Sequence, residues 1–125
     1  MLIHGKERGF KLTIGASKKI SIICPDKDIK NIGKLFKESD TARMIDLVAF
    51  ICSGLSEGYE MEKKFTTPGY EPDVLSEEEI MSLGINEISA LQDEMMDVLE
   101  RDLNTEIETE PVPTKGKKTG KKASK

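Results

Sequence analysis

Apolar residues are densest between Thr41 and Met61, and their spacing predicts a long central helix there. They recur at steps of three and four residues, which places them on one face of an α-helix. Asp40 precedes this run, and its side chain can accept a hydrogen bond from a free amide of the first turn. The apolar face comprises Met44, Leu47, Val48, Ile51, Leu55 and Tyr59, and the polar face comprises Arg43, Asp46, Ser53, Glu57 and Glu60.

Phe50 breaks this pattern because it falls among the polar positions of the central helix. Ile45, Ala49 and Cys52 widen the apolar arc further. A helix that is apolar over most of its circumference needs cover from more than one direction. Two sources of cover stay open: the chain itself, through an N-terminal hairpin and the last helix, or a partner protein.

The first 14 residues are expected to be extended and to form a small β-hairpin. Phe10, Leu12 and Ile14 are separated by single polar residues, which is typical of a half-buried strand. A second, short strand is expected at residues 2–4, with the turn at Gly5-Lys6-Glu7, and His4 is expected to be a strand residue. A two-stranded ribbon is barely stable alone, so its apolar face should pack on the helices.

Caps and breakers predict four shorter helices around the central one, which gives a mainly α fold of about five helices. The expected caps are Ser17, Asp28, Ser76 (in a capping box with Glu79) and Asn86, and Pro25 should end the first helix. The first helix is expected to follow Ser17 and to run through Ile20, Ile22, Ile23 and Cys24. The others are expected at 29–37, 77–83 and 87–103, with a turn-rich loop at 63–73.

The composition changes at residue 104, which separates a helical domain (1–103) from a Lys-rich tail (104–125). The tail lacks apolar periodicity and contains two prolines, so we expect it to be disordered. From Glu106 onward it holds six lysines and three glutamates, a net +3 that leaves −7 on the rest of a chain whose total is −4. An acidic body disfavours nucleic acid as its partner.

Candidate catalytic chemistry is sparse, so we expect a protein that is not an enzyme and uses no metal or cofactor. Cys24 and Cys52 stand singly in apolar surroundings, which favours reduced core thiols, and His4 is the only histidine. The run from Ile45 to Leu55 is much shorter than the roughly 20 residues of a membrane span. With no secretion signal at the N-terminus, the expected location is the cytoplasm. The lysines between Lys18 and Lys37 are expected to form a solvated face.

The order of several segments resembles the tail assembly chaperones of long-tailed phages and prophages of Gram-positive bacteria. The similarity spans roughly Phe10 to Leu103 and depends on order and spacing. The segments are FKLTIGASKKI from Phe10, Cys24-Pro25-Asp26, the helix end at Gly58-Tyr59-Glu60, Pro72, and LSEEEIMSL from Leu75.

This resemblance implies a small, mainly helical protein that is absent from the finished virion. Such chaperones keep the tape-measure protein soluble while tail-tube subunits polymerise around it. Many are made in two lengths by ribosomal frameshifting, and this chain would be the short form, acting in the cytoplasm of the bacterial host.

A chaperone of this kind needs exposed apolar surface, and two clusters are candidates for binding the client or a second copy of the chain. One is on the central helix and the other is a methionine edge. The first comprises Ile45, Ala49 and Phe50, and the second comprises Met81, Met95 and Met96.

Two other function classes remain open. A small interaction or regulatory protein of a mobile element would have a similar composition. A nucleic-acid-binding protein could use the lysines of residues 18–37 together with the Lys-rich tail, against the acidity of the remainder.

Overall fold

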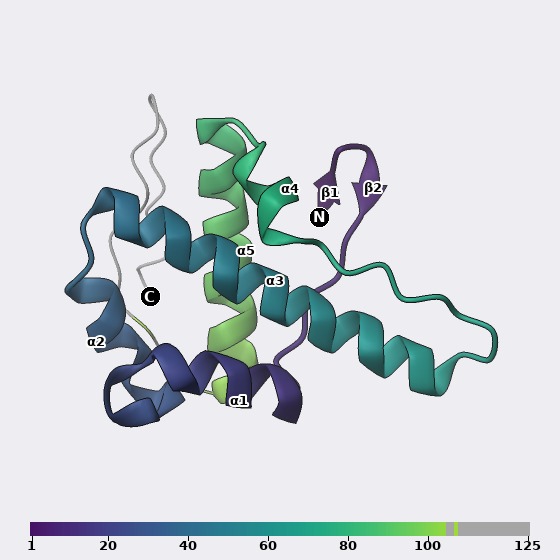
Figure 1. The fold of residues 1–125 in the computed structure, drawn as a ribbon, viewed down its shortest axis with the longest axis horizontal. Coiled ribbons are helices and arrows are strands. Elements are labelled where there is room, and N and C mark those ends of the chain that lie inside the picture. Colours follow the sequence, from purple (N-terminus) through teal and green to yellow (C-terminus); the bar gives the residue numbers. More distant parts are fainter. Residues whose placement is uncertain (105–106, 108–125) are drawn as a thin grey trace.

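The computed structural model describes residues 1–104 and 107, and within this part the fold is mainly α, as predicted (Figure 1). Five α-helices follow a small antiparallel hairpin. The predicted disordered tail lies outside the described residues, apart from Asn104 and Ile107. The elements are β1 (Leu2–Ile3), β2 (Lys6–Glu7), α1 (Ile14–Ile23), α2 (Ile32–Lys37), α3 (Thr41–Thr66), α4 (Glu77–Met81) and α5 (Ile85–Leu103), with 3₁₀ turns η1 (Pro25–Lys27) and η2 (Ile29–Asn31).

The predicted central helix is α3, and it is longer than expected. Asp40 Oδ1 accepts a hydrogen bond of 2.8 Å from the amide of Arg43, so the predicted cap is confirmed. The helix continues to Thr66, into what the sequence predicted to be a loop. Lys63 and Lys64 lie in its last turn, where positive charge interacts favourably with the negative end of the helix dipole.

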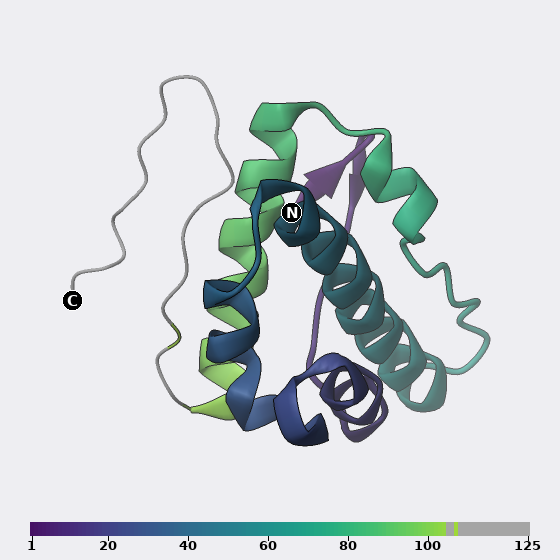
Figure 2. The ribbon, with the colours of Figure 1, turned by 60° about the vertical axis from the view of Figure 1, so that its left-hand side comes forward.

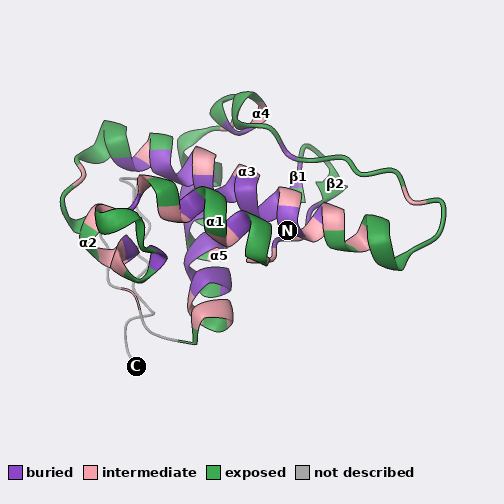
Figure 3. Cartoon of the chain, turned by 60° about the horizontal axis from the view of Figure 1, so that its bottom comes forward, coloured by how far each residue is buried: buried purple, intermediate pink, exposed green. Residues whose placement is uncertain are grey.

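The chain itself covers α3 from several directions. Helices α1, α4 and α5 all contact α3, and their apolar faces enclose its buried residues (Figures 2 and 3). The prediction of cover by the last helix is therefore confirmed, whereas α1 and α4 take the role expected of the hairpin. The largest fully buried side chains are Phe36, Ile20, Ile32, Leu47, Ile51, Leu55, Leu75, Ile80, Leu91, Met95, Leu99 and Gln92.

The hairpin exists, but its predicted second strand is wrong. Leu2 pairs with Glu7 and Ile3 with Lys6, and the turn is formed by His4 and Gly5 with positive φ angles of 52° and 79°. His4 is thus a turn residue and not the expected strand residue, and Lys6 and Glu7, which were expected in the turn, form β2.

Residues 10–13 form an extended segment that crosses α3 and makes no strand pair. Lys11 N donates to Leu55 O at 3.0 Å, and Leu12 N donates to Asp102 Oδ2 at 2.9 Å. The backbone of this segment is therefore bonded to helices α3 and α5 and not to a second strand. Ile14, expected in the strand, begins α1 and is 91% exposed.

Two helix starts differ from the predicted caps. Thr13, not Ser17, caps α1, because Thr13 Oγ1 accepts from the amide of Ala16 at 3.2 Å. Gly84, not Asn86, is the N-cap of α5, and its amide donates to Glu87 Oε1 at 2.8 Å. Each helix consequently begins earlier in the chain than expected.

Other local predictions are confirmed. Pro25 follows the end of α1, and Asp28 accepts from the amide of Lys30 at 2.9 Å. The helix expected at 29–37 is divided into η2 and α2. Ser76 accepts from the amide of Glu79 at 3.0 Å, although α4 ends at Met81 instead of the expected residue 83.

The crossing of the extended segment over α3 requires glycine at position 58. A Cβ at Gly58 would lie 2.4 Å from Lys11 O and 2.9 Å from Thr13 Oγ1. A Cβ at Gly9 would meet the ring of Tyr59 at 2.4 Å. Two glycines, one directly before the segment and one in the helix, therefore permit the close approach.

We expect Gly58→Ala to destabilise the protein by about 1–3 kcal/mol, because the new methyl group displaces a backbone carbonyl. Gly15→Ala is the matched control, since a Cβ there meets nothing within 4 Å and alanine favours the helix. Urea unfolding measures both variants. Equal midpoints for the two variants would contradict the close approach.

Candidate functional site

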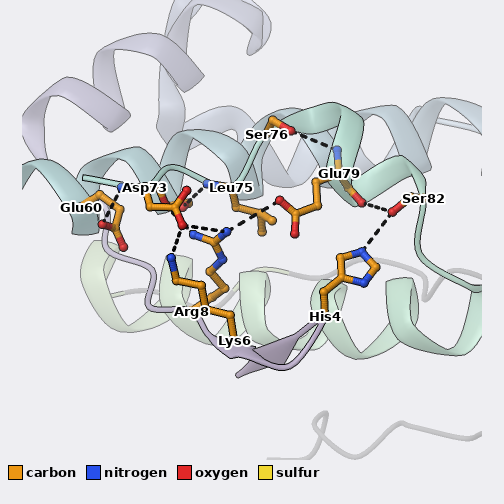
Figure 4. Close-up of polar contacts among 10 residues, drawn as sticks. His4, Lys6, Arg8, Glu60, Asp73, Leu75, Ser76, Glu79 and Ser82 are labelled. Atoms are coloured by element: carbon orange, nitrogen blue, oxygen red, sulfur yellow. Dashed lines mark hydrogen bonds and ion pairs between the residues drawn. The ribbon is translucent and has the colours of Figure 1, made fainter. Parts of the chain in front are cut away.

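A polar cluster ties the hairpin to the loop before α4 (Figure 4). We call it the hairpin–α4 clamp and define it as Lys6, Arg8, Asp73 and Glu79. Arg8 is buried; its Nη1 donates to the carbonyl of Asp73, and its Nη2 lies 3.6 Å from Asp73 Oδ2 and 3.7 Å from Glu79 Oε1. Lys6 forms an ion pair with Asp73 on the exposed side of the cluster.

The clamp lowers the pKa of the Asp73 carboxyl below its ordinary value. The main cause is the hydrogen bond from Lys6, followed by the charge of Arg8. Asp73 is therefore ionised at neutral pH and holds both cations of the hairpin. This arrangement positions the loop and does not present a free group for chemistry.

Glu60 anchors the same loop from α3, which corrects its predicted place on the solvated face. It is 4% exposed, and its Oε1 accepts from the amide of Asp73 at 3.1 Å and from the hydroxyl of Tyr70. One turn earlier on α3, Ser56 Oγ accepts from the amide of Leu75 at 2.9 Å. The loop folds back on α3, so its buried amides need these acceptors.

The hydrogen bond to Glu60 raises the pKa of Tyr70 to about 12, with partial burial and the negative charge of Glu60 as further causes. The proton of the Tyr70 hydroxyl is thus held in the contact throughout the neutral range. The loop from Thr67 to Ser76 is therefore fixed by Glu60 at its middle and by Ser56 near its end.

The structure separates the six predicted partner-binding residues. Ala49, Met95 and Met96 are buried in the core, so neither predicted cluster forms a surface as a whole. Met95 and Met96 are neighbours on α5, and both lie on its buried face. Ile45 and Phe50 are half-buried against the core, and Met81 is 47% exposed. Partner binding at these last three residues stays a prediction.

Met81 lies at an end of the molecule that holds two further exposed apolar residues, and we call Leu2, Met81 and Ile85 the α4 edge. Leu2 is 66% exposed and Ile85 51%. His4 Nε2 lies 3.1 Å from Ser82 Oγ, which brings the hairpin turn to the end of α4 (Figure 4). The members of the edge stand within three residues of this contact along the chain, so they share one end of the molecule.

Sequence reasoning missed Leu2 and Ile85 as members of this edge. Ile85 lies outside the helix that was expected to begin after Asn86, so the wrong cap hid its place in the first turn of α5. Leu2 comes next to the edge only through the contact between His4 and Ser82, which no local pattern predicts.

The two cysteines are core thiols, as predicted. Both are buried and free. Burial raises the pKa of the Cys24 thiol to about 11, with the charge of Asp28 as a second cause, and burial also raises the pKa of Cys52. Neither is a thiolate nucleophile at neutral pH. Among the described residues, no group of three or more His, Cys, Asp or Glu side chains could hold a metal ion.

We expect Arg8→Lys to destabilise the protein by about 1–3 kcal/mol, because an ammonium group cannot reach Asp73 and Glu79 together as the guanidinium does. Arg8 Nε is buried without a partner, and its removal offsets part of this loss. Lys6→Ala is the control: exposed ion pairs contribute little, so its urea midpoint should stay close to that of the wild type. Equal losses in the two variants would show that Arg8 is not the centre of the clamp.

The Tyr70 contact predicts a dependence of stability on alkaline pH. Since the folded-state pKa is raised to about 12 from an ordinary value of 10.0, the stabilisation is complete below pH 10 and is lost as the pH rises through 12. Absorbance titration of the tyrosinate should show a late transition that disappears in Tyr70→Phe and moves to lower pH in Glu60→Gln. A Tyr70 transition near pH 10 in the wild type would contradict the contact.

No helix among the described residues is sufficiently long and apolar to cross a membrane. Comparisons of the chain with protein-family models, with curated proteins and with solved structures found no match.

Proposed function

We propose that this protein is a tail assembly chaperone of a long-tailed phage or prophage, and that it binds the tape-measure protein through the α4 edge. The proposal starts from the sequence resemblance over Phe10 to Leu103. The observation that carries it further is the α4 edge itself, three large apolar side chains exposed at one end of a helical domain. Exposed groups of this kind are typical of surfaces that bind other proteins.

The charge around the α4 edge suits one kind of client. Glu77 and Glu78 are exposed in the first turn of α4, and Glu87 is exposed in the first turn of α5. An amphipathic helix with basic residues beside its apolar face would place aliphatic side chains on the edge and its positive charges against these carboxylates. A tape-measure protein, which is long and helical, offers many such segments.

The remaining details follow the resemblance. The chaperone would act in the cytoplasm of the bacterial host, hold its client while tail-tube subunits polymerise, and leave before the virion is complete. This chain would be the short product. The nucleotide context tests that statement, because a slippery run and an overlapping frame should lie at the 3′ end, ahead of a tape-measure gene.

We expect Met81→Asp combined with Ile85→Asp to weaken binding of the tape-measure protein by tenfold or more, since two buried apolar contacts contribute about 1.5–3 kcal/mol each. Co-expression, with the soluble client measured after centrifugation, reports this effect. Phe65→Asp is the control, because Phe65 is 77% exposed at the far end of α3.

The proposed surface is wrong if the double variant keeps the client soluble while circular dichroism shows an intact fold. The proposed function itself is wrong if the wild-type protein leaves the client as insoluble as it is when expressed alone. Phe50→Asp, tested in the same way, decides whether the half-buried part of α3 contributes.

A further inference from the structure

Ile107, beyond the end of α5, lies back against the domain. Asn104 ends α5 with a left-handed backbone. The amide of Ile107 donates to Glu100 Oε2 at 2.9 Å, which places Ile107 beside the last turns of α5. Its side chain is half-buried and packs against the hydrophobic core. Ile107 therefore anchors the chain at this point.

The other neighbour of Ile107 is α2. A Cβ at Gly33 would lie 3.7 Å from Ile107 Cγ2, which is an ordinary van der Waals distance. Because the amide of Ile107 is bonded to Glu100, the residue contacts α2 with its side chain and α5 with its backbone. The anchor thus joins two helices that are far apart in the sequence.

Lysines flank the position at which Ile107 meets α2. On this helix Gly33 and Lys37 are four positions apart, and Lys34 and Lys37 are three apart, so the three residues are neighbours on one side. Lys34 and Lys37 are exposed, and neither forms an ion pair with a residue that the structure describes. Residues 29–37 hold three lysines and no acidic residue. We call Gly33, Lys34 and Lys37 the α2 basic face.

The sequence that follows Ile107 has the complementary charge. Glu108 and Glu110 come directly after the anchor, and the next lysine is Lys115. An extended chain advances by at most about 3.6 Å per residue, so both glutamates are within about 11 Å of Ile107 along the chain. The flexible stems of lysine side chains can reach carboxylates at this range.

From these observations we propose that Ile107 is the anchor of a clasp, in which the next three residues of the chain bind the α2 basic face. Glu108 and Glu110 pair with Lys34 and Lys37. The occupant of the face is a segment of the same chain, because its first residue is already seated there. Exposed ion pairs are individually weak, but the anchor gives them a high effective concentration.

The clasp changes the charge that the domain presents. It neutralises two lysines that would otherwise attract polyanions such as nucleic acid. It also makes the lysine-rich residues from Lys115 onward leave the domain beside α2. The clasp is independent of the client proposed for the α4 edge.

NMR relaxation of the full chain tests the ion pairs of the clasp. In the wild type at low salt, the amide order parameters of Glu108 and Glu110 should exceed about 0.6, the value below which a backbone is flexible. Lys34→Glu with Lys37→Glu should lower both below about 0.6, because like charges then face each other. Adding Glu108→Lys and Glu110→Lys to this variant should restore them, since opposite charges meet again.

A second pair of variants tests the anchor. Ile107→Ser should lower the order parameters of Glu108 and Glu110 and speed hydrogen exchange of the amide at position 107 at least tenfold. Val112→Ser is the matched control, since it removes an aliphatic side chain beyond the clasp, and it should leave both quantities unchanged. Lys64→Glu reverses an exposed charge at the far end of α3 and should also leave the clasp intact.

Salt separates the two parts of the clasp. About 0.5 M salt should lower the order parameters of Glu108 and Glu110, because it screens exposed ion pairs, and should leave Ile107 ordered by its apolar contact. Flexible glutamates in the wild type at low salt would overturn the proposal, as would a charge exchange that restores nothing. Order that increases with protein concentration would overturn it too, because the occupant would then be the segment of a second copy.

Discussion

The packing of this domain depends on the approach of one backbone segment to one helix. Residues 10–13 lie so close to α3 that Gly58 has no room for a side chain, and the amide of Lys11 donates to the carbonyl of Leu55. This contact fixes the direction of the N-terminal segment. The hairpin is thereby placed beside α4, at one end of α5, and α1 is placed against α3 toward the other end (Figure 1).

Polar contacts add to the small apolar packing that holds α4 against α3. The helix α4 has five residues and buries only Ile80, so its own packing is small. Glu60, Ser56 and Arg8 supply the acceptors and donors that hold the preceding loop, and the loop in turn positions α4. The exposed α4 edge is consequently carried by a rigid support, although the helix that bears Met81 is short.

Local signals were readable from the sequence because they involve groups a few residues apart. Asp40, Ser76 and Pro25 act on their own helix ends, and each prediction is confirmed. The strand predicted at residues 10–14 is wrong because the amides of Lys11 and Leu12 donate to the carbonyl of Leu55 and to Asp102, which lie far away in the sequence, and not to a second strand. The burial of Glu60 was not predicted either, because its partners Tyr70 and Asp73 lie in the loop before α4. Of the α4 edge, sequence reasoning identified Met81 alone.

The bond between Leu12 and Asp102 joins residues that are 90 positions apart. During synthesis, this hydrogen bond cannot form until Asp102 is available, when almost the entire described domain has left the ribosome. Asn104 then ends α5 with a left-handed backbone (φ 58°), just after the contact has become available. Any longer translation product would add its extra residues to a domain whose two ends have already met.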